Sequence, residues 1–207
     1  MQEKKSLQPK HNKAQQVNNK PEPASEFHRQ QGIQKQKPWM RAPAYNITIK
    51  MLKYTNSGIV FQEIPDEVTL SINISNCPCH CPGCHSSYLW EDKGSPLDEC
   101  AIDKFIVTYG EDITCICLMG GDAEPQNIDK LAKFIKRKYN NIKVGWYSGK
   151  SKISDQIDKD NFDYIKIGPY IQHLGGLKSP KTNQRLYKRK KNGEYIDITN
   201  TFWKVKA

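Results

Sequence analysis

The sequence contains no apolar stretch long enough to cross a membrane, and no apolar core of a secretory signal precedes its cysteines. The seven cysteines are an odd number, which does not favour a framework built from disulfides alone. Four of them lie within eight residues, and no second cysteine pair at zinc-knuckle spacing accompanies them. We therefore expect a cytoplasmic protein, with no membrane association, whose cysteines remain reduced and available to a metal centre.

The first 50 residues differ in composition from the rest. They hold ten basic and three acidic side chains, and so carry +7 of the formal net charge of +10. They are rich in Gln, Lys, Asn and Pro, and a segment with so few aliphatic residues cannot bury enough apolar surface to offset the entropy lost on ordering. We expect residues 1–50 to form a disordered basic extension and residues 51–207 to form the folded domain. Translation could also begin at Met51. A basic tail can bind nucleic acid, but a solvated extension is the simpler interpretation.

Strand and helix patterns alternate from residue 68 onward. Alternating or buried apolar runs predict strands at 68–75, 113–119, 143–147 and 163–167. Helical spacing predicts helices at 95–109, where Ser95 begins a capping box and Gly110 ends the helix, at 127–139, and over a short stretch around 153–157. Such alternation predicts an α/β fold with a mostly parallel sheet. Four to six strands cannot close an eight-stranded barrel, so we expect an open, partial one.

Each predicted strand is followed by a loop of small or polar residues. These loops are the cysteine run 77–84, Gly120-Gly-Asp122, Tyr147-Ser-Gly149 and Gly168-Pro-Tyr170. The carboxyl ends of parallel strands lie at one edge of a sheet, where ligands bind. The sequence therefore predicts that these four loops converge.

The cysteine run carries the strongest chemical signal. Cys77, Cys81 and Cys84 have the spacing C-x3-C-x2-C, and thiolates this close in sequence are suited to one metal centre. Three sulfurs are one short of the usual four of a cubane iron–sulfur cluster, so one iron would stay open to another ligand. Together with Cys79 and His85 they also offer enough ligands for tetrahedral zinc, and at this point that alternative stays open.

The C-x3-C-x2-C motif after one strand, with Gly-Gly-Asp after the next, resembles the radical S-adenosylmethionine (SAM) enzymes. Further features are similar to one subgroup, the activating proteins of anaerobic ribonucleoside-triphosphate reductases. They are the Cys-Pro-Gly-Cys run 81–84, Trp90, and the runs 120–125, 146–149 and 163–168. The resemblance covers essentially all of 51–207 and none of 1–50. It implies an open partial (β/α) barrel of radical SAM type.

The resemblance also implies a chemistry. A [4Fe–4S] cluster on Cys77, Cys81 and Cys84 would bind the amino and carboxylate groups of SAM at its open iron. One-electron reduction would cleave SAM, and the 5′-deoxyadenosyl radical would take a hydrogen atom from a glycine of the partner. The implied partners are the large subunit of the anaerobic reductase and a low-potential electron donor such as flavodoxin. A nucleic-acid partner is not expected, and no side chain is assigned a catalytic role.

SAM contacts are implied for Gly83, Cys84, His85, Gly120, Gly121, Asp122, Tyr147 and Ser148. Asp122 would accept from the SAM ammonium, and Tyr147 and Ser148 would contact ribose or adenine. Gly83 stands where many superfamily members have an aromatic residue, and Asp122 stands where Glu is commoner. Cys79 is given no ligand role, and His80 and His173 are expected at the surface. Two alternatives remain, namely an activase of the pyruvate formate-lyase type and a zinc-binding nucleic-acid module.

Overall fold

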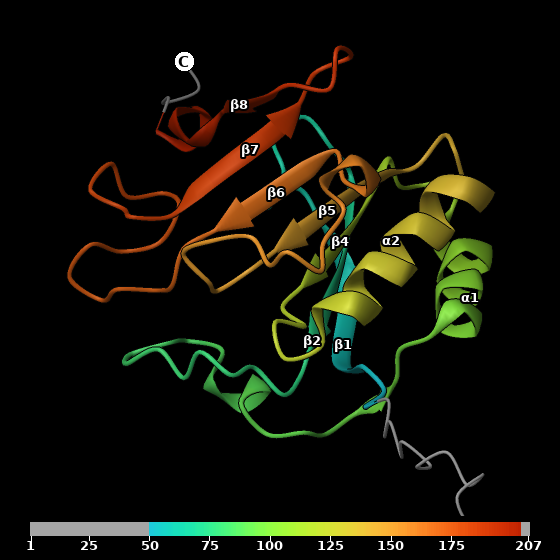
Figure 1. Cartoon of the computed structure of the whole chain (residues 1–207), viewed down its shortest axis with the longest axis horizontal. Helices are drawn as coiled ribbons and strands as arrows, with labels where there is room; N and C mark the ends of the chain where they lie inside the picture. Colours follow the sequence, from blue (N-terminus) through green and yellow to red (C-terminus); the bar gives the residue numbers. More distant parts are fainter. Residues whose placement is uncertain (1–49, 204–207) are drawn as a thin grey trace, which may run out of the picture. The chain divides into compact units, whose positions relative to one another are not determined.

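The computed structural model describes residues 50–203, so the predicted N-terminal extension falls almost entirely outside the described residues. Eight strands form one sheet in the order β3-β1-β2-β4-β5-β6-β7-β8 (Figure 1). The strands are β1 (Lys53–Val60), β2 (Thr69–Ile74), β3 (Ser95–Pro96), β4 (Cys115–Met119), β5 (Lys143–Tyr147), β6 (Tyr164–Ile167), β7 (Arg185–Arg189) and β8 (Tyr195–Asp197). The helices are α1 (Glu99–Tyr109) and α2 (Pro125–Lys138), with short 3-10 turns at Ser87–Leu89, Lys159–Asn161 and Thr199–Phe202. No helix in the range 50–203 is long and apolar enough to span a membrane.

The centre of the sheet agrees with the sequence prediction. Strands β2, β4, β5 and β6 are adjacent and mutually parallel. They correspond to the four predicted strands, and β5 begins and ends at the predicted residues. Their buried apolar side chains explain why the sequence pattern predicted these strands.

The outer strands correct the expectation of a mostly parallel sheet. Four of the seven pairings are antiparallel: β1 with β2, β1 with β3, β6 with β7, and β7 with β8. Antiparallel neighbours need only a short connection and no crossover helix. A prediction based on alternating strands and helices therefore does not include them. The basic run Lys188–Lys191 begins within β7, and only its last two residues form the turn before Gly193.

The helices differ from prediction at two places. The α1 helix begins later than expected, with Asp98 as its N-cap, whose side chain accepts a hydrogen bond from the Ala101 amide at 2.8 Å. Ser95 and Pro96 pair instead with β1 at the sheet edge, where proline is tolerated. The short helix expected around 153–157 does not form. Instead, Asp129 of α2 accepts from the Asp158 amide at 2.8 Å, which fixes this segment as turns against the helix.

The two faces of the sheet carry different apolar layers. Both helices cover one face (Figure 1), where the core includes Leu70, Ile72, Ile116, Leu118, Ile128, Ile135, Val144, Trp146 and Ile165. The opposite face holds a smaller cluster of Ile64, Cys115, Cys117, Tyr147, Tyr164 and Leu186, against which Ile198 and Phe202 pack. Because side chains alternate along a strand, the cysteine loop can meet β4, β5 and β6 at the carboxyl edge of this second face.

A buried carboxylate joins the amino ends of the central strands. Glu67 accepts hydrogen bonds from Lys143 at 2.5 Å, Thr114 at 2.6 Å and Tyr164 at 2.6 Å. Burial raises the pKa of Glu67, but these three donors outweigh it and hold the pKa below its ordinary value. The network lies at the edge opposite the cysteine loop, so its role is to hold the strands in register.

Candidate iron–sulfur site

The loops after β4 and β5 are joined by one carboxylate. Asp122 accepts a hydrogen bond from the Ser148 hydroxyl on one oxygen, at 2.5 Å, and from the Gly149 amide on the other, at 2.8 Å. The Trp146 indole N–H also donates to the Gly120 carbonyl at 2.9 Å. Two of the four predicted loops are therefore in direct contact.

The loops after β5 and β6 are joined by a buried lysine. The Lys166 ammonium donates to the Gly168 carbonyl at 2.9 Å and to the Ser148 carbonyl at 3.3 Å. Burial lowers the pKa of Lys166 to about 8, and the charges of Asp122 and the nearby cysteines oppose that shift. A cation thus lies at the point where three of the loops meet.

The cysteine loop is held by the backbone that follows it. The Cys77 amide donates to the Leu89 carbonyl at 2.9 Å, and the Cys84 amide donates to the Cys81 carbonyl at 3.1 Å. Asn76, His80 and Gly83 have positive φ angles, which fold this short segment back on itself. Cys81 is buried, while Cys77, Cys79 and Cys84 are half-buried, and all four are free thiols.

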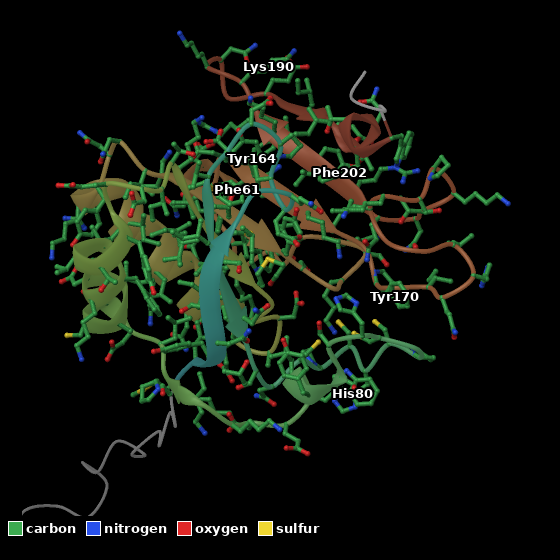
Figure 2. The ribbon with its side chains drawn as sticks, turned by 180° about the vertical axis from the view of Figure 1, so that it is seen from behind. Phe61, His80, Tyr164, Tyr170, Lys190 and Phe202 are labelled. Carbon is green, nitrogen blue, oxygen red and sulfur yellow. The ribbon has the colours of Figure 1, made fainter. Side chains whose placement is uncertain are left out.

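This loop contacts both neighbouring loops. A Cβ placed on Gly149 would lie 2.7 Å from the Cys79 sulfur, and one placed on Gly83 would lie 2.7 Å from the Gln172 side-chain oxygen. Figure 2 shows the loop of His80 facing the loop of Tyr170, with sulfur atoms between them. The structure therefore brings all four predicted loops together at the carboxyl edge of the central strands.

The donor set suits an iron–sulfur cluster better than a single ion. No group of three or more His, Cys, Asp and Glu side chains within residues 50–203 is placed to hold one metal ion. In a four-iron cluster each cysteine binds a different iron, so the sulfurs need not converge on one point. Three free thiols on one loop, with the spacing C-x3-C-x2-C, fit that requirement.

Cys79 differs from the other three cysteines in its surroundings. Its burial, together with the charges of Asp122 and Cys77, raises the pKa of its thiol to about 12. That Cys79 is no cluster ligand stays a prediction.

The glycine pair after β4 is required by the fold itself. Gly120 and Gly121 have φ angles of +104° and +82°. A Cβ on Gly121 would overlap the terminal methyl of Ile128 in α2, and one on Gly120 would lie 3.1 Å from the Ile74 carbonyl oxygen. A side chain at Gly121 would thus enter the α2 packing. The contact of this glycine pair with SAM stays a prediction.

The hydroxyls predicted to contact the nucleoside have partners within the protein. The Tyr147 hydroxyl donates to the Glu63 carbonyl, and burial raises the pKa of Tyr147. Ser148 is fully buried; its hydroxyl donates to Asp122 and accepts from the Lys150 amide at 3.0 Å. In this arrangement both side chains hold loops in place.

The three histidines that the structure describes lie at the surface. His85 and His173 are exposed, and His80 is exposed while stacking on Trp90 with ring centroids 4.9 Å apart.

Sequence reasoning missed Lys166, the most buried cation of the site. The sequence could have indicated it, because a lysine within the buried strand run 164–167, on the same strand face as Tyr164, is unusual.

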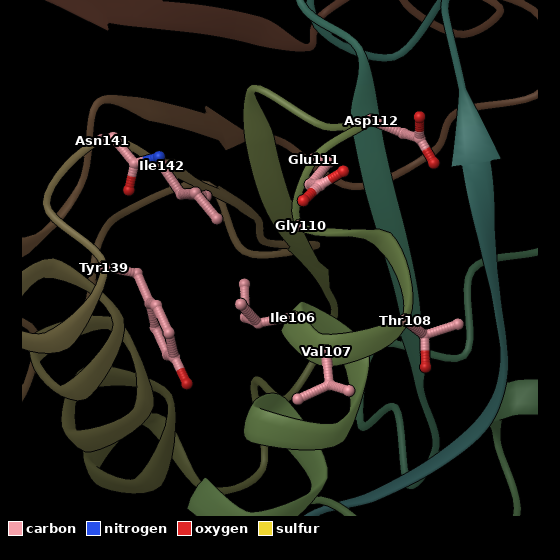
Figure 3. A pocket seen from close by; sticks show the side chains of 9 residues that line it. All are labelled: Ile106, Val107, Thr108, Gly110, Glu111, Asp112, Tyr139, Asn141 and Ile142. Atoms are coloured by element: carbon pink, nitrogen blue, oxygen red, sulfur yellow. The ribbon is translucent and has the colours of Figure 1, made fainter. Parts of the chain in front are cut away.

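Two hollows lie on different edges of the sheet. One, of about 380 Å³, is lined by Asp122, Pro125, Trp146, Lys150, Ser151, Lys152 and Ser154, beside the candidate site. The other, of about 360 Å³, lies between the ends of the two helices and includes Ile106, Glu111 and Tyr139 (Figure 3). Its segments lead into the starts of β4 and β5, so it belongs to the edge away from the cysteine loop.

Comparison with curated proteins and with solved structures finds no match to this chain. The central strands and the cysteine loop do match a family model. Residues 67–167, which run from the start of β2 to the end of β6, match the 4Fe-4S single cluster domain family, and this match supports iron–sulfur binding by that part of the chain.

Proposed function

We propose that this chain is a radical SAM activase that generates a glycyl radical on an anaerobic ribonucleoside-triphosphate reductase. The observation that carries the proposal is the placement of Cys77, Cys81 and Cys84. They lie on the loop after the first of four parallel strands, inside the region that matches a 4Fe-4S single cluster domain. Strands β2, β4, β5 and β6, with both helices on one face, would form the core of a partial radical SAM barrel.

The three cysteines would hold a [4Fe–4S] cluster. When bound and reduced, such a cluster with one open iron supplies the electron that cleaves SAM into methionine and a 5′-deoxyadenosyl radical. The chain's own task is to position SAM and exclude water. The cysteine loop is supported from both sides, by Gly149 and by Gln172, which suits a site that must keep its geometry.

The methionine end of SAM would be received by the loop of Gly120, Gly121 and Asp122. The Gly120 amide and the carbonyls of Gly120 and Gly121 already have partners within the protein, so the Asp122 carboxylate would be the group that meets SAM. Each oxygen of Asp122 accepts one hydrogen bond from the protein. A carboxylate oxygen has a further lone pair, which could accept a hydrogen bond from the ammonium group of SAM. Gly83, Cys84 and His85 would line the exposed side.

Tyr147 and Ser148 would contribute by fixing the loop after β5, since their hydroxyls already have protein partners. The hollow beside Asp122 is next to this loop and could admit part of the nucleoside. The backbone of this loop, more than its hydroxyls, would then contact the ligand.

The substrate would be a glycine on a loop of the partner reductase. The cysteine loop and the loop after β6 face one another at the open edge of the sheet (Figure 2), and the partner's loop would dock against this edge. A low-potential donor such as flavodoxin would reduce the cluster. These partners are cytoplasmic proteins, which agrees with the proposed location.

The test is to mix reduced protein, SAM and the reductase without oxygen and to record the EPR spectrum. The proposal predicts a glycyl-radical doublet on the reductase, and no doublet with the Cys81→Ala variant. A doublet formed only on pyruvate formate-lyase would assign the other activase class. Consumption of a free small molecule in place of radical transfer would refute the activase assignment.

A further inference from the structure

Lys166 is a cation in the interior of the domain. It lies on β6, only 8% exposed, and its side chain is on the same face of the sheet as Tyr164. Lysine is almost never this buried unless it has a partner of opposite charge. Its position therefore needs a physical explanation.

Within the part of the chain that the structure describes, this charge is not neutralised by a direct ion pair. Among residues 50–203, no ion pair within 4.0 Å involves Lys166. The ammonium has three donors, and its two partners, the carbonyls of Ser148 and Gly168, are neutral. A buried charge without an opposite charge is costly, so a negative group bound nearby would stabilise it.

The surroundings of Lys166 show where such a group would lie. The acidic groups that act on it come from the loop after β4 and from the cysteine loop, namely Asp122, Cys81, Cys79 and Cys77. Asp122 supplies one negative charge, although its oxygens accept hydrogen bonds from Ser148 and Gly149 and form no ion pair with Lys166 within 4.0 Å. The cysteine loop is the other source of negative charge, and it packs against the loop after β5, where Gly149 meets Cys79. Lys150, the neighbouring cation, is exposed and hydrated.

We propose that Lys166 is the buried counter-charge of the cluster on Cys77, Cys81 and Cys84 and raises its reduction potential. This inference rests on the cluster part of the proposed function and does not require SAM cleavage. A cluster bound by three thiolates becomes more negative by one charge when reduced. A fixed cation nearby stabilises the reduced state more than the oxidised one, and net charge, hydrogen bonding and burial set such potentials.

The experiment is a redox titration of anaerobically reconstituted protein without SAM, followed by EPR. Lys166→Gln keeps a donor for the two carbonyls but loses the charge, whereas Lys166→Arg keeps the charge. We expect Lys166→Gln to lower the equilibrium constant of reduction at least tenfold, a shift of about 59 mV toward more negative potential. Lys166→Arg should stay close to wild type. Lys150→Gln, which removes an exposed charge at the same edge, should shift the potential less than Lys166→Gln.

Each outcome has one meaning. An unshifted potential in Lys166→Gln overturns the proposal. Equal shifts in Lys166→Gln and Lys166→Arg would show that the residue acts by holding loops. If Lys166→Gln loses its iron and Lys166→Arg keeps it, the positive charge is needed for cluster binding, which supports the proposal. If both variants lose their iron, the proposal is contradicted. A wild-type chain that binds no four-iron cluster would refute the proposed function instead, before any variant is compared.

Discussion

The contact between Gly149 and the cysteine loop gives a quantitative test of how the site is assembled. The change is Gly149→Ala. Its new methyl carbon would lie 2.7 Å from the Cys79 sulfur, 3.3 Å from the Cys79 Cβ and 3.6 Å from the nearer Asp122 oxygen. Carbon atoms do not approach a sulfur this closely, so the cysteine loop or the loop after β5 must shift.

The size of the effect follows from two opposing contributions. Inserting a methyl group into a packed contact costs about 1–3 kcal/mol. Replacing glycine by alanine where the backbone permits it stabilises by about 0.4–1 kcal/mol through the unfolded state. We expect Gly149→Ala to lower the free energy of unfolding by about 1–2 kcal/mol. In a Cys79→Ala background the sulfur is gone, and the cost should nearly vanish.

Urea unfolding of iron-free protein with reduced thiols measures all four members of this double-mutant cycle. Gly58→Ala is the matched control, because a Cβ at Gly58 meets nothing within 4 Å. The account predicts a coupling energy of about 1 kcal/mol or more between positions 79 and 149. Additivity within about 0.5 kcal/mol, or equal effects of Gly149→Ala and Gly58→Ala, would refute the contact between these loops.

Three further predictions concern the cluster, the strands and the extension. Replacing any one of the three cluster cysteines by alanine should abolish the cluster, whereas Cys79→Ala should keep about four irons per chain by iron analysis; the reverse pattern would refute the ligand assignment. Glu67→Gln should lower the free energy of unfolding at pH 7 by about 1.5–3 kcal/mol. Because the pKa of Glu67 is depressed when folded, its contribution is present above the ordinary pKa of 4.5 and is lost as the pH falls through the folded pKa. The gap between wild type and Glu67→Gln in urea melts should therefore close in acid, and a constant gap would refute the charge argument. A chain beginning at Met51 should fold, bind iron and cleave SAM like the full chain, and loss of the cluster would show that the extension contributes to the fold.

The central strands were predictable because their burial is uniform. Strand β4 is almost entirely buried, and β5 has the same character, so both read as continuous apolar runs. Strand β1 contains Asn56, Ser57 and Gly58 and is only half-buried, so its pattern is weak. Strand β7 is rich in basic residues because it lies near the sheet edge, where charged side chains remain hydrated.

The convergence of the loops followed from topology, but the contacts within them did not. Parallel strands place their carboxyl ends together whatever the loop sequences are. Which group a side chain meets depends on tertiary distances that spacing does not encode. The Ser148 hydroxyl reaches Asp122 across 26 positions of the chain, and a side chain at Gly121 would point at Ile128. Sequence could therefore locate the site and name its thiols, and the structure was needed to find the buried Lys166.

The most direct test of the central claim is the fate of SAM on the reduced protein. Reconstituted chain is reduced anaerobically, mixed with SAM, and assayed by liquid chromatography for 5′-deoxyadenosine and methionine. The account predicts both products from wild type and neither from Cys77→Ala. A reduced chain that holds four irons yet leaves SAM intact would contradict the radical SAM assignment while preserving the iron–sulfur site.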